Sequence, residues 1–457
     1  MATITFLGGT DTVTGSKFLL TSDGASLLID CGLFQGPDEM RRLNWDDPAF
    51  HGSLPQEVVL THAHIDHSGY LPRLVGHYGF AGPVRATSAT VDLLGVMLPD
   101  SARLQQETAE YANRKGYSRH HPALPLYTEE DARRALDLLA SAPYHEWLDV
   151  PVGRARLAMA GHILGSAHVT VETGGRRVVF SGDVGRWDIP VLKDPEPPTG
   201  ADLLLIESTY GGRRHEEKAD PDGMLAAAVQ KVTRRHGIMV IPAFSVGRAQ
   251  EVLYRLRRLE DDGRIPRLPV FLDSPMAIDA TELYRRHHEE HDLEMDALED
   301  AGRAPLRTAH LQMTRTVEES KKLNELDPPA IIISASGMAT GGRVVHHLKR
   351  RLPFRQNLVA FVGYQAEGTL GRSLVGGAKT VHIHGEEIEV RAEVIMLDAF
   401  SAHADAEELL RWVREAAPKR IALIHGEPEG RRALAEALAG VFPGEVLFPA
   451  RGGTLEV

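Results

Sequence analysis

The chain has 457 residues, a length that predicts two domains rather than a single core. Its 43% hydrophobic and 25% charged residues are typical of a globular protein, and its formal net charge of −12 argues against a protein that coats nucleic acid by charge alone. The single cysteine, Cys31, excludes an internal disulfide and a thiolate metal cluster. The sequence shows no signal-peptide pattern at its start and no apolar run near the ~20 residues of a membrane span, so we expect a cytoplasmic protein.

The first part of the chain is predicted to be rich in short strands. Runs of apolar and β-branched residues, bounded by turn signals such as Gly174-Gly175, indicate where these strands begin and end. The strands expected here cover residues 3–6, 17–21, 26–30, 84–87, 154–159, 168–173 and 177–180. Residues 98–147 are polar with a helical pattern instead, and we expect them to form a helical cover.

A proline-rich connector at residues 193–200 leads into a different pattern. After it, apolar strands and helices alternate, which implies a parallel sheet covered on both faces and hence a Rossmann-like α/β domain. The strands expected there cover residues 203–206, 238–241, 270–272 and 331–334, and the helices cover residues 223–236 and 246–259. From about residue 390 the pattern returns to short strands, with a terminal strand, helix and strand at residues 421–424, 428–441 and 445–448.

The densest cluster of metal-ligand side chains directly follows the predicted buried strand at residues 58–60. His62, His64, Asp66 and His67 lie in the run His62-Ala63-His64-Ile65-Asp66-His67, whose spacing does not fit one face of a helix and therefore suits a tight loop. Imidazole and carboxylate are the ligands that borderline divalent ions such as zinc prefer. Because four such groups cannot converge on one small ion without strain, we expect them to serve two neighbouring ions.

Further ligand candidates follow other predicted strands. The first ion is assigned His62, His64 and His162, and the second ion is assigned Asp66, His67 and His425. Asp183 would bridge the two ions, and Asp30 would orient the metal-binding loop from behind. Such a pair, ~3.5–4 Å apart, acidifies a shared water to hydroxide and clamps the attacking and leaving oxygens. His168 competes with His162, but it starts a strand, whereas His162 leaves a strand into a glycine loop.

Two more residues suggest general acid chemistry. Glu207 ends a predicted strand, and His403 lies in the run Phe400-Ser401-Ala402-His403-Ala404-Asp405. A histidine held by a carboxylate can stay protonated and donate a proton to a leaving alkoxide. Together with Asp66, these residues are our candidate catalytic groups. Outside the metal context, a helix-start role for His403 and a surface charge at Glu207 explain the same residues about equally well.

Three predicted strand–loop–helix segments, at residues 243–248, 331–343 and 363–372, carry glycine and arginine and suggest phosphate binding. A helix N-terminus fed by a glycine turn presents free N–H groups, and arginine makes bidentate phosphate contacts. None of the three loops is a Walker A loop, and an ordinary βα turn is the alternative explanation for each of them. The candidate phosphate or RNA contacts are Arg248, Ser336, Gly337, Arg343, Arg372 and Ser401.

With these residues identified, the chain resembles the metallo-β-lactamase superfamily, through His62-x-His64-x-Asp66-His67, His162, Asp183 and His425. It resembles more specifically the β-CASP branch of nucleases, through Glu207-Ser208-Thr209-Tyr210-Gly211, Gly363-Tyr364-Gln365, Phe400-Ser401-Ala402-His403-Ala404-Asp405 and His425-Gly426-Glu427. Within that branch it is most similar to the bacterial and archaeal relatives of the endonuclease subunit of the cleavage and polyadenylation specificity factor. In that family Glu207, His403 and His425 match motifs A, B and C, and a histidine at motif C is typical of members that cleave RNA.

The resemblance implies an αββα sandwich with an inserted β-CASP cap domain. Residues 1–200 and 390–457 would form the sandwich, and residues 201–389 the cap. We therefore expect a zinc-dependent ribonuclease with two zinc ions per chain, single-stranded RNA as its substrate and a homodimer as one option for its assembly. The alternatives are a hydrolase of small esters or thioesters, a DNA nuclease of the same branch, and a non-catalytic RNA-processing scaffold.

Overall fold

A computed structural model of the chain describes residues 2–48, 50, 54–116, 121–214, 220–363, 365–366, 368–397 and 400–457. The chain forms two compact units. Unit 1 comprises Met1–Asp188, Asp194–Arg214 and His403–Val457, and unit 2 comprises Ile189–Lys193 and His215–Ala402. Tyr364, which belongs to one of the predicted motifs, lies outside the described residues.

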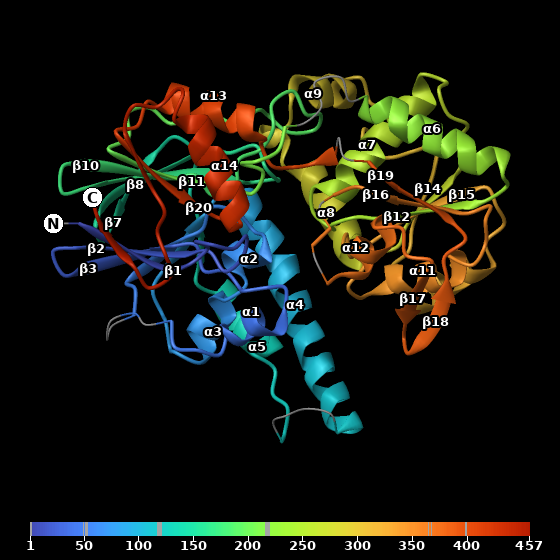
Figure 1. The fold of residues 1–457 in the computed structure, drawn as a ribbon, viewed down its shortest axis with the longest axis horizontal. Helices are drawn as coiled ribbons and strands as arrows, with labels where there is room; N and C mark the ends of the chain where they lie inside the picture. Colours follow the sequence, from blue (N-terminus) through green and yellow to red (C-terminus); the bar gives the residue numbers. More distant parts are fainter. Residues whose placement is uncertain are drawn as a thin grey trace. The chain divides into compact units, whose positions relative to one another are not determined.

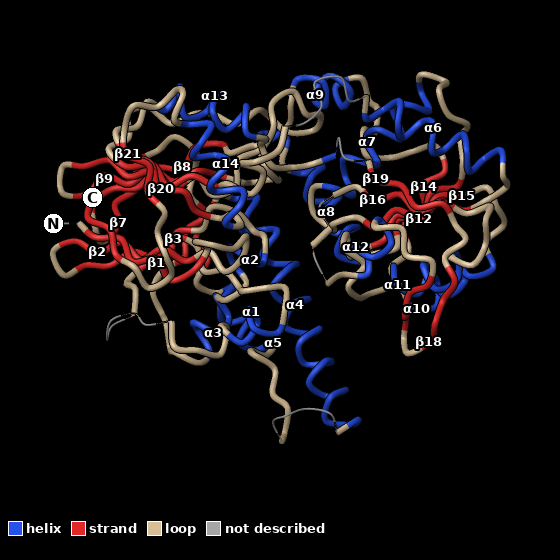
Figure 2. The backbone as a smooth tube through the Cα atoms, in the orientation of Figure 1, coloured by secondary structure: helices blue, strands red, loops and turns tan. Residues whose placement is uncertain are grey.

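Unit 1 contains two seven-stranded sheets that pack face to face, seen as two groups of strands in Figure 2. The first sheet has the order β22 (Thr454–Glu456), β1 (Thr3–Gly8), β2 (Lys17–Ser22), β3 (Ala25–Ile29), β4 (Glu57–Val59), β5 (Val84–Ala86) and β6 (Leu139–Ser141). The second has the order β21 (Glu445–Leu447), β20 (Arg420–Ile424), β11 (Leu203–Glu207), β10 (Arg176–Phe180), β9 (Ala167–Thr173), β8 (Gly153–Met159) and β7 (Trp147–Val150). Alternate strand residues such as Ile4, Phe6 and Leu20 point into the core between the sheets, as the two-residue period of a strand requires.

Helices cover the outer face of each sheet of unit 1 (Figure 1). The first sheet is accompanied by α1 (Asp38–Arg42), α2 (Ile65–Ser68), α3 (Leu71–Gly76), α4 (Ser88–Lys115) and α5 (Glu129–Leu136). Helices α13 (Ala406–Ala416) and α14 (Pro428–Leu438) bury Trp412 and Leu434 against Leu204 and Leu423 of the second sheet. This order of layers confirms the predicted αββα sandwich.

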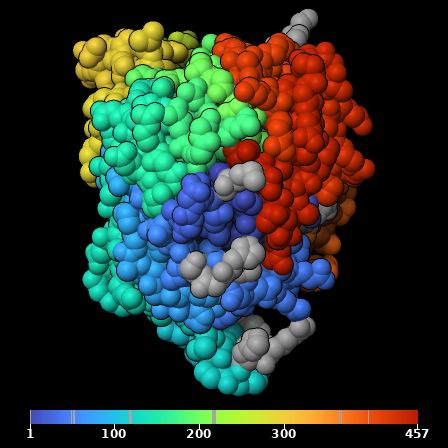
Figure 3. Space-filling view, turned by 90° about the vertical axis from the view of Figure 1, so that its left-hand side faces the viewer, coloured from blue at the N-terminus to red at the C-terminus, as the bar shows by residue number. Residues whose placement is uncertain are grey.

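Both ends of the chain contribute to unit 1. Strand β1 pairs antiparallel with β22, so that Thr3 lies opposite Glu456 in the ladder. In Figure 3 the blue N-terminal segments and the red C-terminal segments lie side by side on the surface. Segments far apart in the sequence, β1 and β22, therefore lie next to each other in the first sheet.

Unit 2 is built around a six-stranded sheet in which every pair of neighbours is parallel. Its order is β14 (His310–Met313), β13 (Pro269–Leu272), β15 (Ala330–Ser334), β12 (Ile238–Pro242), β16 (Leu358–Phe361) and β19 (Glu393–Met396). A separate hairpin consists of β17 (Thr380–Ile383) and β18 (Glu386–Glu389). The predicted Rossmann-like character of this part is confirmed.

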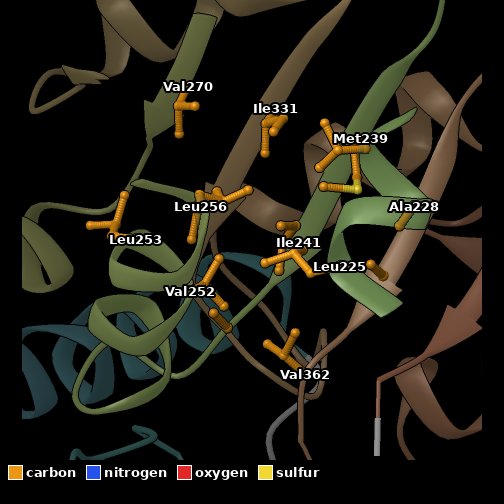
Figure 4. Packing of buried hydrophobic residues seen from close by; sticks show 14 of the residues in the cluster. Leu225, Ala228, Met239, Ile241, Val252, Leu253, Leu256, Val270, Ile331 and Val362 are labelled. Atoms are coloured by element: carbon orange, nitrogen blue, oxygen red, sulfur yellow. The ribbon is translucent and has the colours of Figure 1, made fainter. Parts of the chain in front are cut away.

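The helices of unit 2 pack on both faces of its sheet, because nearly continuous apolar strands offer two buried faces. They are α6 (Pro221–Arg234), α7 (Arg248–Asp261), α8 (Pro275–Arg286), η1 (His288–Glu290), α9 (Leu293–Asp300), α10 (Val317–Lys322), η2 (Leu323–Glu325), α11 (Arg343–Arg351) and α12 (Leu370–Val375). Figure 4 shows one face, where Val252 and Leu256 of α7 gather with Ile241 of β12 and Ile331 of β15. None of the helices in the described parts of the chain is long and apolar enough to cross a membrane.

The structure differs from the sequence-based outline in several places. Strand β11 was predicted to open the Rossmann-like domain, but it pairs with β10 and β20 in the second sheet of unit 1, so unit 1 extends to Arg214 rather than to residue 200. Residues 65–68 form the short helix α2 and not part of a tight loop. Strand β6 lies inside the segment predicted to be a helical cover. Its three residues are too short a run to show a strand pattern in the sequence, and they adopt the strand conformation by pairing with β5. Strand β19 is hydrogen-bonded in parallel to β16, with Leu358 opposite Glu393, so it belongs to the sheet of unit 2. The chain accordingly returns to unit 1 at His403 rather than at residue 390.

Candidate metal centre

Strand ends position the ligand candidates of unit 1. His162, Asp183 and His425 follow β8, β10 and β20, which run in the same direction within the second sheet. The loop with His62 and His64 follows β4 of the facing sheet. Because strands of one direction end at one edge of a sheet, these side chains converge although up to 363 residues of sequence separate them (425 − 62).

The first group consists of three histidines and one carboxylate oxygen. His64 Nδ1 lies 3.1 Å from His62 Nε2 and 3.2 Å from His162 Nε2. Both of those Nε2 atoms lie 3.6 Å from Oδ2 of Asp183. Four potential ligand atoms therefore face a common point, and three of the four residues are buried.

The second group shares Asp183 through its other oxygen. His67 Nε2 lies 3.2 Å from His425 Nε2, and Asp66 Oδ2 lies 3.4 Å from the same His425 atom. Oδ1 of Asp183 lies 3.3 Å from His67 Nε2 and 3.2 Å from His425 Nδ1. One carboxylate thus offers Oδ2 to the first group and Oδ1 to the second.

These residues fit divalent metal ions. The buried Oδ1 of Asp183 has no hydrogen bond of acceptable geometry to any described residue, although a buried carboxylate oxygen is costly to leave without a partner. Histidine nitrogens facing each other at about 3 Å are explained by a shared cation, which turns mutual repulsion between lone pairs into coordination. Imidazole and carboxylate together form a donor set for borderline divalent ions, so unit 1 holds a metal-binding site.

Asp30 and Thr61 hold the metal-binding loop from behind. His67 donates its Nδ1 proton to Oδ2 of Asp30 over 2.8 Å, which leaves the lone pair of Nε2 directed at the centre. The backbone N–H of Thr61 donates to Oδ1 of Asp30 at 2.8 Å, and its hydroxyl donates to Oδ2 at 2.9 Å. In the sequence, only the position of Thr61 directly before His62 marks it as part of the site.

Burial and charge inside the centre keep His62 and His64 neutral and Asp183 ionised. Burial, together with the charge of His67, holds the pKa of His62 well below its usual range, and burial lowers the pKa of His64 to about 4. Burial also disfavours the charged form of His67, but Asp183 and Asp30 outweigh this effect and raise its pKa well above the ordinary value. The pKa of Asp183 is lowered well below its usual range, since His425 and His67 overcome the cost of burial. Neutral imidazole and ionised carboxylate are the forms of His62, His64 and Asp183 that can bind a metal ion.

The buried carboxylate of Glu207 and the partly exposed ring of His403 form an ion pair beside the first group. His403 Nδ1 lies 3.1 and 3.2 Å from the two oxygens of Glu207 and 4.0 Å from Oδ2 of Asp183. Burial lowers the pKa of His403, but Glu207 and Asp183 outweigh it and raise this pKa to about 9. Glu207 is 0% exposed and accepts the backbone N–H of Val184 at 2.7 Å, so the alternative interpretation as a surface charge is wrong.

The structure shows that Thr209 contacts a ligand candidate of the centre and that His168 does not belong to the centre. The hydroxyl of Thr209, in the run Glu207-Ser208-Thr209-Tyr210-Gly211, lies 3.1 Å from His425 Nδ1, a contact that was not predicted from the sequence. His168, the alternative to His162, lies in β9 and packs its ring against Trp412 at a centroid distance of 5.5 Å. His168 is therefore a core residue and does not belong to the metal group.

The candidate phosphate contacts all lie in unit 2, in the loops and helices that follow its parallel strands. Arg248 is buried and paired with Glu251. Arg343 donates to Oδ1 of Asp273 at 2.7 Å and to two backbone carbonyl oxygens, so much of its hydrogen-bonding capacity is used within the protein. Arg372 is exposed on α12. The remaining candidates are partly or fully buried, and they are Ser336, Gly337 and Ser401.

Models of three families match the chain. They are the metallo-beta-lactamase superfamily over residues 11–212, the Beta-Casp domain over residues 249–374 and the Zn-dependent metallo-hydrolase RNA specificity domain over residues 387–447. The chain is 39% identical over 435 residues to Ribonuclease TTHA0252 of Thermus thermophilus, with 94% of this chain and 95% of the relative covered. It is also 31% identical over 461 residues to Transcription termination factor FttA of Methanocaldococcus jannaschii, with 98% of this chain and 70% of the relative covered.

Among solved structures, the chain is similar to the crystal structure of a protein of unknown function from Enterococcus faecalis. The two are 15% identical, 100% of each chain is covered, and the TM-score is 0.52. This similarity concerns the fold alone.

Proposed function

Because the chain belongs to the β-CASP branch of the metallo-β-lactamase superfamily, we propose that it is a metal-dependent ribonuclease that hydrolyses RNA phosphodiester bonds. The observation that carries the proposal is the combination of a buried histidine–carboxylate centre with a protonated histidine beside it. A relative that shares most of its length with this chain carries the name of a ribonuclease, which supports RNA as the substrate.

Two zinc ions per chain are the proposed cofactors. His62, His64 and His162 would hold one ion, and Asp66, His67 and His425 would hold the other, with Asp183 contributing one oxygen to each. When bound, such a pair acidifies water and neutralises the charge that develops on the phosphate. Asp30 would fix the tautomer of His67 and so keep the second ligand set in place.

His403 is the proposed general acid. Because its Nδ1 atom donates to Glu207, the transferable proton sits on Nε2. In hydrolysis the attacking water loses one proton to solvent and its oxygen bonds to phosphorus, the bond from phosphorus to the leaving oxygen breaks, and His403 protonates that oxygen. Glu207 stabilises the imidazolium before this transfer. Asp66, whose side chain is 18% exposed, is the carboxylate of the centre best able to orient the attacking water.

Single-stranded RNA is the proposed partner of unit 2. Arg372 is exposed and is the proposed arginine for direct phosphate contact, with Ser336, Gly337 and Ser401 as further contacts. Arg248 and Arg343 already bind carboxylates, so we propose that they contact phosphate with the capacity that remains and otherwise hold their loops in place. A homodimer stays a prediction, which sedimentation velocity tests.

The test compares cleavage of a labelled single-stranded RNA with cleavage of the DNA of the same sequence, using protein of measured metal content. We expect RNA cleavage that a chelator abolishes, that zinc restores, and that is lost in Asp183→Ala and His403→Ala. RNA cleavage by either variant at the wild-type rate would disprove the mechanism. Intact RNA with thioester hydrolysis would favour a small-ester hydrolase, and equal cleavage of DNA would favour a nuclease without sugar selectivity.

A further inference from the structure

A second group of metal-ligand side chains lies in unit 2, on the turn and helix formed by η1 and α9, which is labelled in Figure 1. We call it the His288 cluster, and it consists of His288, His291 and Glu299. His288 Nδ1 lies 2.7 Å and His291 Nδ1 lies 3.4 Å from Oε2 of Glu299. Asp296 adds a second carboxylate, 3.7 Å from His291 Nδ1. Three ligand atoms from two adjacent elements therefore lie within 4.8 Å of one another.

The tautomer of His291 is fixed by its other nitrogen. Nε2 donates to the carbonyl oxygen of Tyr284 at 2.6 Å, and the residue is 0% exposed. A carbonyl oxygen can only accept, so the proton of the neutral ring sits on Nε2 and the lone pair sits on Nδ1. Histidines that bind metal ions commonly have this arrangement, in which one ring nitrogen donates a hydrogen bond to the protein and the other directs its lone pair at the ion.

The free lone pair of His291 points at carboxylates rather than at a donor. Nδ1 of His291 and Oε2 of Glu299 are both buried, and neither has a hydrogen bond of acceptable geometry to a described residue. Two acceptors facing each other at 3.4 Å in a water-poor environment repel each other, and burying them without partners is costly. An ion pair between His288 and Glu299 alone would leave the His291 nitrogen unsatisfied. A cation among the three side chains satisfies all of them.

We propose that the His288 cluster is a further divalent metal site, of the zinc class. Two imidazole nitrogens and a carboxylate oxygen are the ligand set that such an ion prefers, and Asp296 offers a fourth ligand. The side chain of His288 is 63% exposed, so an ion can enter from solvent while His291 holds it from inside. The site lies in unit 2 and shares no residue with the centre of unit 1, so it does not depend on the proposed ribonuclease activity.

The bound ion would be structural, because the turn that it braces holds another chain segment. The backbone N–H of Val191 donates to Oδ2 of Asp292 at 2.8 Å, and that of Lys193 donates to the carbonyl oxygen of Glu290 at 3.0 Å. Leu192 forms a β-bridge with His291 itself. An ion that fixes η1 to α9 would therefore also fix residues 191–193, which are attached to the same turn.

Metal stoichiometry tests the proposal. The full-length wild type and the variants His288→Ala and Glu299→Gln would be equilibrated with zinc by dialysis and measured by elemental analysis. We expect each variant to bind one ion per chain fewer than the wild type. His145→Ala is a matched control, because it removes another half-exposed histidine paired with a glutamate, 3.6 Å apart, and should leave the zinc content unchanged. Equal zinc content in the wild type and both variants would overturn the proposal.

Hydrogen–deuterium exchange gives a second, activity-independent readout. Zinc should slow exchange of the amides of Val191 and Lys193 in the wild type and in His145→Ala, but not in the two cluster variants. If zinc slows exchange equally in all four proteins, the proposal is wrong. RNA cleavage should stay at the wild-type rate in the cluster variants. If the cluster variants bind one ion fewer but the wild type cleaves no RNA, the proposed function is refuted while the proposal of a metal site at the His288 cluster stands.

Discussion

The pairing of His403 with Glu207 makes a sharp prediction about pH dependence. The pKa of His403 rises from its ordinary value of 6.5 to about 9, chiefly because Glu207 overcomes the cost of burial, and this corresponds to about 3 kcal/mol in favour of the protonated ring. A general acid must be protonated, so activity should fall as the pH rises through this pKa. Glu207→Gln keeps the shape and removes the charge, and the pKa of His403 should return toward 6.5.

The expected effect on rate follows from the fraction of protonated His403. Without metal, a pKa of about 9 leaves most of His403 protonated at pH 8, whereas a pKa near 6.5 leaves roughly one part in thirty, so the rate of the variant should begin to fall at a lower pH than that of the wild type. Divalent ions in the centre repel the imidazolium and lower its pKa in both proteins alike. The difference between the alkaline midpoints of the two pH–rate profiles, rather than either midpoint alone, therefore measures how much the charge of Glu207 raises the pKa of His403.

The assay is the pH profile of single-turnover RNA cleavage at saturating zinc, for the wild type and Glu207→Gln. A loss of orientation at His403 would lower the rate equally at every pH and would not move the alkaline limb. The limb should move to lower pH by the amount of the lost stabilisation. If both proteins share the same alkaline limb, the protonated His403 is not the acid and the proposed step is refuted.

The same raised pKa has a consequence for folding. Because the pKa of His403 is higher in the folded than in the unfolded chain, its ion pair stabilises the fold fully below pH 6.5, and this contribution is lost as the pH rises through about 9. The difference in unfolding free energy between the wild type and Glu207→Gln should therefore be largest below pH 6.5 and should shrink at alkaline pH. A difference that grows with pH would contradict the assignment of the charge to His403.

Further predictions concern the acid, the support of the centre and the arginines of unit 2. His403→Ala should lose about 10²–10⁴-fold in rate on ordinary RNA, and a substrate with sulfur as the leaving atom should recover most of this loss, since a thiolate leaves without a proton. Asp30→Asn should bind zinc about 10–100-fold more weakly in a competition titration, because an amide nitrogen cannot accept the histidine proton that the carboxylate accepts. Arg343→Ala should lower the unfolding free energy by about 1–3 kcal/mol by leaving buried Asp273 short of a partner, and Arg372→Ala should weaken RNA binding. An Arg343→Ala variant as stable as the wild type would contradict the structure.

The metal-binding loop could be predicted from the sequence because its signal is local. His62, His64, Asp66 and His67 fall within a few residues after an apolar strand. His62 and His64 lie in the loop that follows this strand, whereas Asp66 and His67 lie in the short helix α2, which the predicted tight loop did not include. The convergence of His162 and Asp183 was predictable for a related reason, since strands of one direction end at one edge of a sheet. The layers of the fold followed from the alternation of short strands and helices.

The partners of the arginines could not be predicted in the same way. Arg343, the first residue of α11, binds Asp273, which directly follows β13 and lies 70 residues earlier in the chain. Nothing in either local sequence marks this pairing, because a charged residue after a strand can face solvent, a phosphate or another charge with equal ease. The edge strand β6 escaped prediction for a comparable reason, as its conformation depends on pairing with β5 rather than on its own residues.

The His288 cluster shows where sequence and structure differ in what they can reveal. His288 and His291 are three residues apart and Glu299 follows eight residues later, a spacing that any charged helical region produces by chance. The structure adds the one observation that distinguishes a metal site from a surface ion pair, namely a buried histidine whose anchored tautomer leaves its lone pair facing a carboxylate. In the centre of unit 1 the same criterion holds for Asp183, whose buried Oδ1 lacks a hydrogen bond to the described residues. Acceptors that face one another without a donor are therefore the common physical reason for expecting a cation at both places.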